Sequence, residues 1–141
     1  MIDYRTHDIA DAVKAATDGR GADAIYDPVG GDAFTSATRC VALEGRTLAI
    51  GFASGRWGQV DASQLVYGNF SVVSVIASFY DRAFKERTQQ RLLAWWREGR
   101  LRPQIDELVE FQALPEALER LLSGGVKGKL VLAVDANATS P

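Results

Sequence analysis

Two glycine-bearing turns hold the residues of this sequence that could contact a ligand. The first is Asp27-Pro28-Val29-Gly30-Gly31 and the second is Gly51-Phe52-Ala53-Ser54-Gly55, and each follows a short apolar run. Glycine has no Cβ, so backbone N–H and C=O groups can approach a bound molecule closely. The same glycines also suit turns that need unusual dihedral angles, and this structural interpretation is nearly as good as the binding one. The two turns are the candidate binding site.

The other reactive side chains form no recognisable catalytic group. His7 is the only histidine, and we expect it on the solvated side of a first helix, because metal ligation needs convergent partners. Cys40 is the only cysteine, which excludes an internal disulfide and a multi-cysteine metal cage and favours a packed small apolar residue over a nucleophile. Asp106, Glu107 and Glu110 are better explained as a solvated acidic surface than as an acid–base pair. We therefore predict no catalytic residue and no metal site.

The composition limits the classes of partner and compartment. The chain has 141 residues, 47% of them hydrophobic and 24% charged, which is normal for about one globular domain. A net charge of -2 gives no electrostatic footprint for nucleic acid or an anionic membrane. The longest apolar stretch, Val72 to Ala77, is too short to span a bilayer, and the single cysteine fits a reducing cytosol. We expect a cytoplasmic protein that binds neither nucleic acid nor membrane.

Hydrophobic periodicity predicts alternating helices and strands around the two turns. Helical spacing covers residues 9–18, 32–44, 81–99 and 114–123, and strand-like runs cover residues 24–26, 47–50, 70–76, 104–112 and 129–134. Phe34, Ala37 and Val41 form the predicted inner stripe of the second helix, and 56–68 is predicted as a polar loop. Helices between successive strands provide the crossovers that a parallel sheet requires.

An ordered series of short motifs carries a family resemblance from Met1 to about Val134. The motifs are Ile2-Asp3-Tyr4-Arg5, Gly19-Arg20-Gly21-Ala22-Asp23, Tyr26 to Gly31, Gly45-Arg46, Gly51 to Gly55 and Gly128 to Leu132. Their order resembles that of zinc-independent medium-chain dehydrogenases/reductases, with the NADPH:quinone oxidoreductases as the closest match. An independent flavodoxin-like or methyltransferase-like α/β enzyme is the alternative fold, and no site residue supports it.

The resemblance implies a fold and a division into parts. The expected fold is α/β, with a partial Rossmann-like, doubly wound parallel sheet that lacks its first two strands. Residues 1–99 would form the partial dinucleotide-binding domain, with an edge strand at 70–77. Residues 100–134 would form a strand-helix-strand segment that returns to the substrate-domain part of the family fold, and 135–141 a tail.

The resemblance also implies cofactor-binding residues for NADPH. A tyrosine at the position of Tyr4 lies beside the adenosine 2′-phosphate in the resembling enzymes, although an amphipathic edge residue explains Tyr4 equally well. The two turns would pass the cofactor at the carboxyl ends of their strands, and Pro28 departs from serine-bearing versions of the first turn. The residues implied in the turns are Asp27, Pro28, Val29, Gly51, Phe52, Ala53 and Ser54.

The usual pyrophosphate-binding motif has no counterpart in this sequence. No G-x-G-x-x-G turn occurs, and Met1 to Arg5 reads as the third strand, in the middle of a dinucleotide-binding domain. Neither the first two strands nor the substrate domain is matched, so the chain alone is not expected to catalyse hydride transfer. Two hypotheses remain: the cofactor-domain part of an NADPH-dependent quinone or enoyl reductase completed by another polypeptide, or a non-catalytic, self-associating module with weak or no nucleotide binding.

The strand at 70–77 predicts self-association. In the resembling enzymes this strand pairs with its copy across a two-fold axis, and a long β-rich edge must be covered, paired or interrupted. A buried strand within one chain is the alternative, because central strands have a similar composition. The strand at 24–27 would form a second open edge. We expect a homodimer through 70–77 or an exchange of segments between chains, with a complementing polypeptide as a further expected partner.

Overall fold

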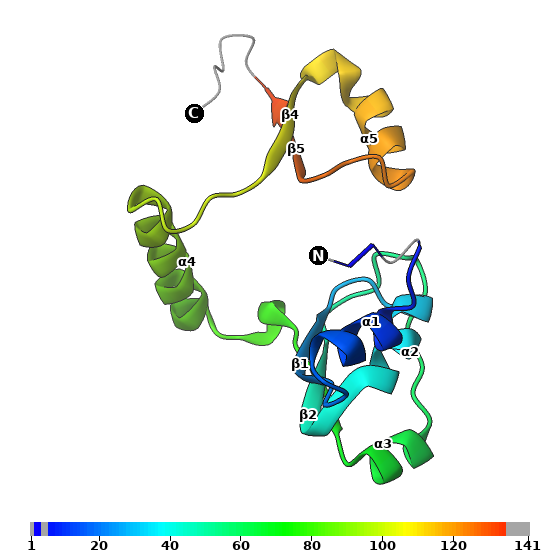
Figure 1. Ribbon diagram of the computed structural model, residues 1–141. Helices are drawn as coiled ribbons and strands as arrows, with labels where there is room; N and C mark the ends of the chain where they lie inside the picture. The colour runs from blue at the N-terminus through cyan, green and yellow to red at the C-terminus, as the bar shows by residue number, and fades with distance from the viewer. Residues whose placement is uncertain (1, 4–5, 135–141) are drawn as a thin grey trace. The chain divides into compact units, whose positions relative to one another are not determined.

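The chain folds into two compact α/β units. The computed structural model describes residues 2–3 and 6–134 (Figure 1). The units are Met1–Tyr80 and Asp81–Pro141, and each contains a parallel sheet. None of the helices in the described part of the chain combines the length and the apolar character that a membrane crossing requires. The domain boundary expected after residue 99 concerns the family's domains and stays a prediction.

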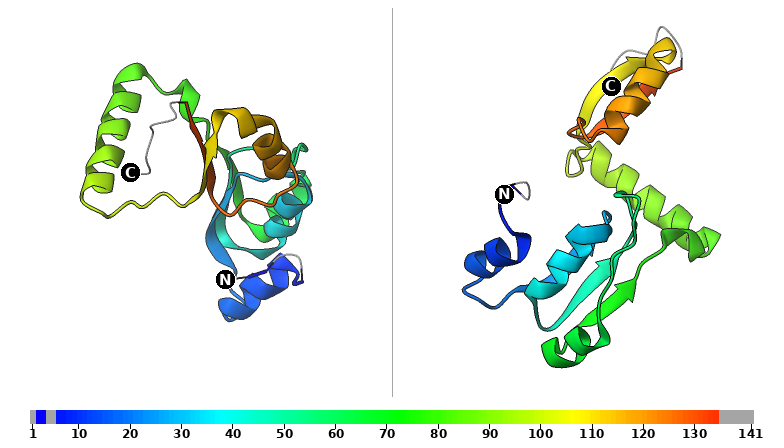
Figure 2. Two further views of the ribbon diagram at one scale, coloured as in Figure 1. Left: turned by 90° about the horizontal axis from the view of Figure 1, so that it is seen from above. Right: turned by 90° about the vertical axis from the view of Figure 1, so that its right-hand side faces the viewer.

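The first unit contains a three-stranded parallel sheet in the order β1-β2-β3. Its helices α1 and α2 pack against each other, and their colours identify them in the right-hand view of Figure 2. The elements in chain order are α1 (Ile9–Ala16), β1 (Ala22–Asp27), α2 (Gly31–Ala37), the 3₁₀ turn η1 (Thr38–Cys40), β2 (Val41–Ala49), α3 (Ala62–Gly68), β3 (Ser71–Ser74) and the 3₁₀ turn η2 (Ala77–Phe79).

The second unit pairs two parallel strands beside one helix, with a longer helix before them. Its elements are α4 (Arg82–Arg97), β4 (Ile105–Glu110), the 3₁₀ turn η3 (Phe111–Ala113), α5 (Leu114–Leu122) and β5 (Lys129–Ala133). Figures 1 and 2 show α5 beside the β4–β5 pair, where Ala117 and Val109 are buried. The parallel sheets and intervening helices confirm the predicted α/β class.

The core of the first unit lies where α1, α2 and η1 meet β2. Its buried apolar side chains are Ala10, Phe34, Ala37, Cys40 and Ala42. Thr47, in the middle of β2, is fully buried, and its hydroxyl has no hydrogen-bond partner among the described residues. An unpaired buried hydroxyl costs about 1–3 kcal/mol. This hydroxyl is therefore a local cost within the strand that precedes the second turn.

Local signals explain where the predicted helices begin and end. The side chain of Asp8 accepts hydrogen bonds from the Ala10 and Asp11 amides, which caps α1, and Gly19 follows the helix with φ +83°. Asp81 caps α4 in the same way, and Gly99 follows with φ +70°. Both predicted helices are confirmed to within a few residues.

The predicted second helix is wrong over its last third. The α-helix ends at Ala37 and a 3₁₀ turn continues to Cys40, so Val41 belongs to β2 and not to the inner stripe of a helix. Val41 pairs with Ala22 of β1, and β2 then passes through Gly45. A Cβ on Gly45 would lie 2.8 Å from the Ala42 carbonyl oxygen, so here the glycine serves a close backbone approach within a strand rather than a helix stop.

Two further elements differ from their predicted extents. The polar loop predicted at 56–68 contains α3, whose N-terminus has a capping box formed by Asp61 and Gln64. The strand predicted at 70–77 is only Ser71–Ser74, although the Val75 amide still donates to the Ala49 carbonyl oxygen, 3.1 Å away. The chain then enters η2, which ends the run of strand pairing.

Candidate functional site

The two glycine-bearing turns lie side by side because β1 and β2 are adjacent parallel strands. Both turns therefore leave the same edge of the sheet. The Ala53 amide donates to the Pro28 carbonyl oxygen (3.1 Å), and the Ser54 amide donates to the Val29 carbonyl oxygen (2.9 Å). These direct hydrogen bonds bring the predicted residues of both turns together in one structural unit.

Asp27 holds the first turn in shape. Its side chain is buried, and its carboxylate accepts hydrogen bonds from the backbone amides of Val29 (2.9 Å) and Gly30 (3.1 Å). Its carbonyl oxygen accepts hydrogen bonds from the amides of Gly51, which begins the second turn, and of Ile50, directly before it. The sequence placed Asp27 among the cofactor contacts, whereas the structure shows that both carboxylate oxygens already serve the backbone of the turn.

Two glycines allow the turns to touch. Gly30 has φ +71°, and a Cβ there would lie 2.6 Å from the Arg56 carbonyl oxygen. A Cβ on Gly51 would lie 3.2 Å from the Pro28 carbonyl oxygen. The contact at Gly30 is closer than a Cβ tolerates, so a larger residue there would force the turns apart, whereas the contact at Gly51 is tight but needs only a small shift of its neighbour. The glycines therefore have a structural role at the junction of the two turns.

The second turn exposes an aromatic pair and a serine. The rings of Phe52 and Trp57 lie 4.3 Å apart between centroids, and both side chains are exposed. The Ser54 hydroxyl donates to the Arg56 carbonyl oxygen (3.2 Å) and accepts from the Arg56 amide (3.4 Å). The turn is thus fixed from Gly51 to Arg56 by local hydrogen bonds and by the first turn.

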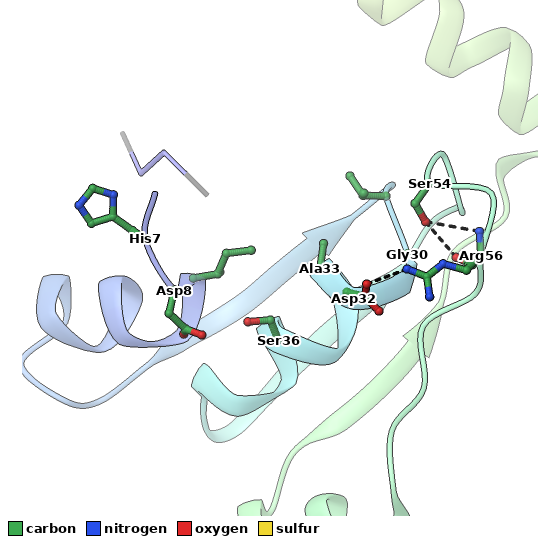
Figure 3. Close-up of a pocket in the computed structure, with 10 residues that line it drawn as sticks. His7, Asp8, Gly30, Asp32, Ala33, Ser36, Ser54 and Arg56 are labelled. Carbon is green, nitrogen blue, oxygen red and sulfur yellow. Dashed lines mark hydrogen bonds and ion pairs between the residues drawn. The ribbon is translucent and has the colours of Figure 1, made fainter. Parts of the chain in front are cut away.

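An open pocket of about 370 Å³ lies between the start of α1, the first turn with α2, and the end of the second turn (Figure 3). Val29 and Ser54 are the predicted site residues that line it. The other lining residues are His7, Asp8, Ile9, Gly30, Asp32, Ala33, Ser36 and Arg56. Tyr4 lies outside the described residues. The pocket combines an apolar wall with serine, carboxylate and guanidinium groups, which are the groups that bind sugars, phosphates and aromatic rings.

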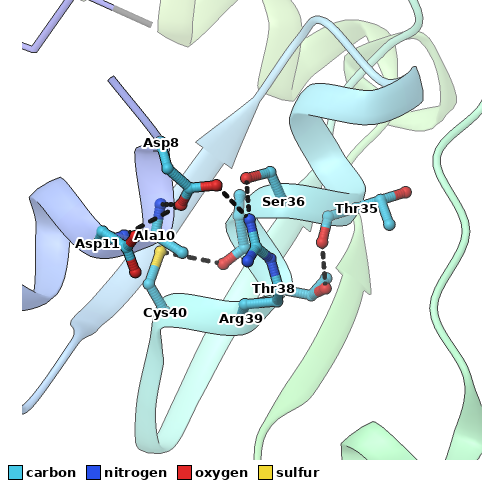
Figure 4. A network of polar contacts seen from close by, with 9 residues as sticks. Asp8, Ala10, Asp11, Thr35, Ser36, Thr38, Arg39 and Cys40 are labelled. Atoms are coloured by element: carbon cyan, nitrogen blue, oxygen red, sulfur yellow. Dashed lines mark hydrogen bonds and ion pairs between the residues drawn. The ribbon is translucent and has the colours of Figure 1, made fainter.

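Two ion pairs border this pocket. The Arg56 guanidinium lies 2.7 Å from the Asp32 carboxylate, and the Arg39 guanidinium lies 2.6 Å from the Asp8 carboxylate (Figures 3 and 4). Arg39 and the amides capped by Asp8 hold the pKa of the Asp8 carboxyl below its ordinary value. The Asp8 carboxylate already accepts hydrogen bonds from two backbone amides and from Arg39. Arg56 and Asp32 form the more exposed ion pair, and this pair is better able to exchange its partner for a ligand.

Sequence reasoning missed Asp8, Asp32 and Arg56 as pocket residues. An N-cap signal was available for Asp8, which directly precedes the apolar period of the first helix. No local signal was available for Arg56, because it lies 24 positions from Asp32 and only the adjacency of β1 and β2 brings the two together.

The remaining reactive residues do not converge on the pocket as a metal or nucleophile site. Burial raises the pKa of the Cys40 thiol, which donates to the Ala37 carbonyl oxygen, as predicted for a packed residue (Figure 4). His7 is exposed just before α1, not on it. Across residues 2–3 and 6–134, no group of three or more His, Cys, Asp or Glu side chains could hold a metal ion. The donor set in this part of the chain does not fit a zinc centre.

Comparisons with known proteins identify what the fold and the turns are similar to. A family model described as zinc-binding dehydrogenase matches residues 1–132. The chain is 33% identical to the quinone oxidoreductase-like protein 2 homolog of Nematostella vectensis, over 93% of this chain and 37% of the relative. It is 29% identical to quinone oxidoreductase-like protein 2 of Bos taurus, over 94% of this chain and 39% of the relative. The chain therefore spans less than two fifths of the length of these relatives.

The structural comparison agrees. The chain superposes on a quinone oxidoreductase from Pseudomonas syringae pv. tomato DC3000 with a TM-score of 0.80 and 27% identity, covering 93% of this chain and 41% of that one. It superposes equally well, at a TM-score of 0.80 and 27% identity, on an NAD-dependent alcohol dehydrogenase, covering 95% of this chain and 37% of that one. The residues that the family model matches, 1–132, include both turns.

Proposed function

Because the chain belongs to the zinc-binding dehydrogenase family and corresponds to the C-terminal, cofactor-domain part of its quinone oxidoreductase-type members, we propose that its two turns bind a nicotinamide dinucleotide. NADPH is the cofactor we propose, for an oxidoreductase of the quinone or enoyl type. The alcohol dehydrogenase of similar fold is NAD-dependent, which supports a nicotinamide cofactor in general.

One observation carries the proposal: the hydrogen-bonded junction of the two turns beside a pocket at the carboxyl ends of β1 and β2. Parallel α/β sheets bind their ligands at this edge. Val29, Gly30 and Ser54 of the two turns line the pocket, and so do the apolar residues Ile9 and Ala33. A nucleotide needs this combination, with apolar surface for its base and polar groups for its ribose and phosphates.

The chain's own residues would hold and orient the dinucleotide. The bound cofactor would supply the hydride, whereas the turns fix its position and Asp27 keeps the first turn in shape. Hydride transfer also requires the substrate in reacting geometry. We propose that the glycine-rich loop and the substrate domain come from additional polypeptide, and that the 141-residue chain by itself does not reduce quinones.

A self-associating module is the second candidate function, and the open sheet edges favour it. In the described residues β1 and β3 each pair only with β2, so each has one free edge. Exposed backbone donors and acceptors on such edges favour pairing with another chain. We propose a homodimer through β3. This arrangement is compatible with cofactor binding at the carboxyl ends of β1 and β2, because the free edge of β3 is not part of that site.

The cofactor proposal is tested by titrating the chain with NADPH and following the fluorescence of the reduced nicotinamide. We expect saturable binding that Ala33→Trp abolishes, because the indole would fill the pocket that Ala33 lines. Ala15→Trp, on the exposed face of α1, is the matched control and should bind like the unsubstituted chain. Equal binding by Ala33→Trp, or no saturable change up to millimolar NADPH, would refute the proposed site.

A further inference from the structure

Arg56 is the one arginine or lysine among the described residues that line the pocket. We propose that it binds a phosphate group of the dinucleotide, and that Asp32 holds the guanidinium until the phosphate replaces it. This inference rests on the proposed function and adds a binding residue outside the predicted turn positions. The guanidinium suits the role because its planar set of donors matches phosphate oxygens in pairs.

The backbone of Arg56 is fixed against both turns. Ser54 bonds to both the amide and the carbonyl oxygen of Arg56, and that carbonyl lies so close to Gly30 that a Cβ there would collide with it. The side chain therefore extends from an anchored position towards α2, where it meets Asp32 (Figure 3). A charged group on a fixed backbone is a suitable element for binding a ligand in one orientation.

The pair between Arg56 and Asp32 is suited to exchange. Both side chains are largely exposed, at 66% and 86%, and exposed ion pairs of this kind contribute little stability. Arg56 is the only side chain for which the structure gives the Asp32 carboxylate a bond among the described residues. Asp8, by contrast, is bound by two amides and by Arg39, so that pair does not exchange readily. The 2′-phosphate monoester, which carries more charge than a carboxylate, or the pyrophosphate, which has two charged groups side by side, would therefore compete for Arg56.

The test measures binding by calorimetry with three probes: NADPH, NADH and inorganic pyrophosphate. We expect Arg56→Gln to weaken binding roughly tenfold or more, as loss of a charge-assisted hydrogen bond does. A loss of affinity for NADPH alone assigns the 2′-phosphate as the group that Arg56 binds, and a loss for all three probes assigns the pyrophosphate.

Asp32→Asn should tighten binding by removing the competing carboxylate, and this gain should vanish when Arg56→Gln is also present. Arg20→Gln is the matched control, because Arg20 pairs with Asp23 on the surface, outside the pocket.

The outcomes separate the two proposals. If the unsubstituted chain binds NADPH and Arg56→Gln binds it as tightly, the role of Arg56 is refuted while the cofactor site stands. If pyrophosphate binds in an Arg56-dependent manner but neither dinucleotide binds, Arg56 is a phosphate-binding residue and the proposed function fails. If no probe binds, both proposals fail.

Discussion

The carboxylates near the pocket differ in what they are free to do. Asp27 and Asp8 are engaged by backbone amides and so maintain local structure, whereas Asp32 is bound only at the surface by Arg56. Residue type alone therefore did not identify which acid could respond to a ligand. The hydrogen-bond partners determine which acid can respond, because a carboxylate that caps a turn or a helix cannot move to a ligand without leaving backbone amides unpaired.

The ion pair between Arg39 and Asp8 predicts a pH-dependent contribution to stability (Figure 4). The pKa of Asp8 is lowered in the folded chain from its ordinary value of 3.8, with the Arg39 hydrogen bond as the largest cause. The folded state therefore gains from this pair above about that pH, and the gain is lost as the pH falls through the lowered pKa. We expect Arg39→Met to decrease the free energy of unfolding at neutral pH, and the difference to narrow in acid.

Urea unfolding of the unsubstituted chain and of Arg39→Met over a range of pH measures the difference in their free energies of unfolding. Arg39→Lys should retain part of the difference because it keeps the charge but not the guanidinium geometry. A constant difference at every pH would show that Arg39 stabilises the chain by packing alone, contrary to the prediction.

At the scale of elements, helix bounds were predicted best where a capping residue and the helical spacing of apolar residues indicate the same start and end. The helices α1 and α4 follow capping aspartates and end before Gly19 and Gly99, and all of these signals are local. The second helix was predicted too long because Val41 continues its helical spacing, while pairing of Val41 with β1 decides the outcome in the fold. Tertiary pairing of this kind has no local signal.

The helix α3 could have been found from the sequence. Asp61 and Gln64 form the D-x-x-Q spacing of a capping box, directly before Leu65 and Val66. The segment 56–68 was predicted as a loop because its composition is polar, although the capping-box spacing indicates a helix. The helix is short and has no buried residue, so its stability depends on this cap more than on packing.

The open edge of β3 gives a test of self-association. The Val75 amide faces β2, and successive amides of a strand point to opposite sides, so the Ser74 amide points away from β2. Ser74→Pro should leave the fold intact, since proline is tolerated on a free strand edge, and should weaken the proposed dimer at least tenfold. Val73→Pro is the contrasting variant and should destabilise the sheet itself. Sedimentation of a dimer unaffected by Ser74→Pro would exclude pairing through β3, as would a monomer at micromolar concentration without any substitution.

At the scale of the whole molecule, the order of motifs predicted the α/β fold and the family, and the family match and the structural neighbours confirm both. The sequence also predicted the two turns as one candidate site, and the hydrogen bonds between them show that they are adjacent. It could not predict the pocket's charged border, since Asp8, Asp32 and Arg56 converge only through the three-dimensional arrangement of α1, α2 and the second turn. Cofactor choice and dimerisation remain predictions.

The most direct test of the central claim is a ¹H–¹⁵N NMR titration of the chain with NADPH. If the two turns bind the dinucleotide, the amide signals of Val29, Gly30, Ser54 and Arg56 shift saturably, because these residues line the pocket. Signals from α5 should change least and serve as the internal reference. Turn signals that stayed unchanged at saturating cofactor, or largest shifts on α5 and its neighbouring strands, would exclude the two turns as the binding site.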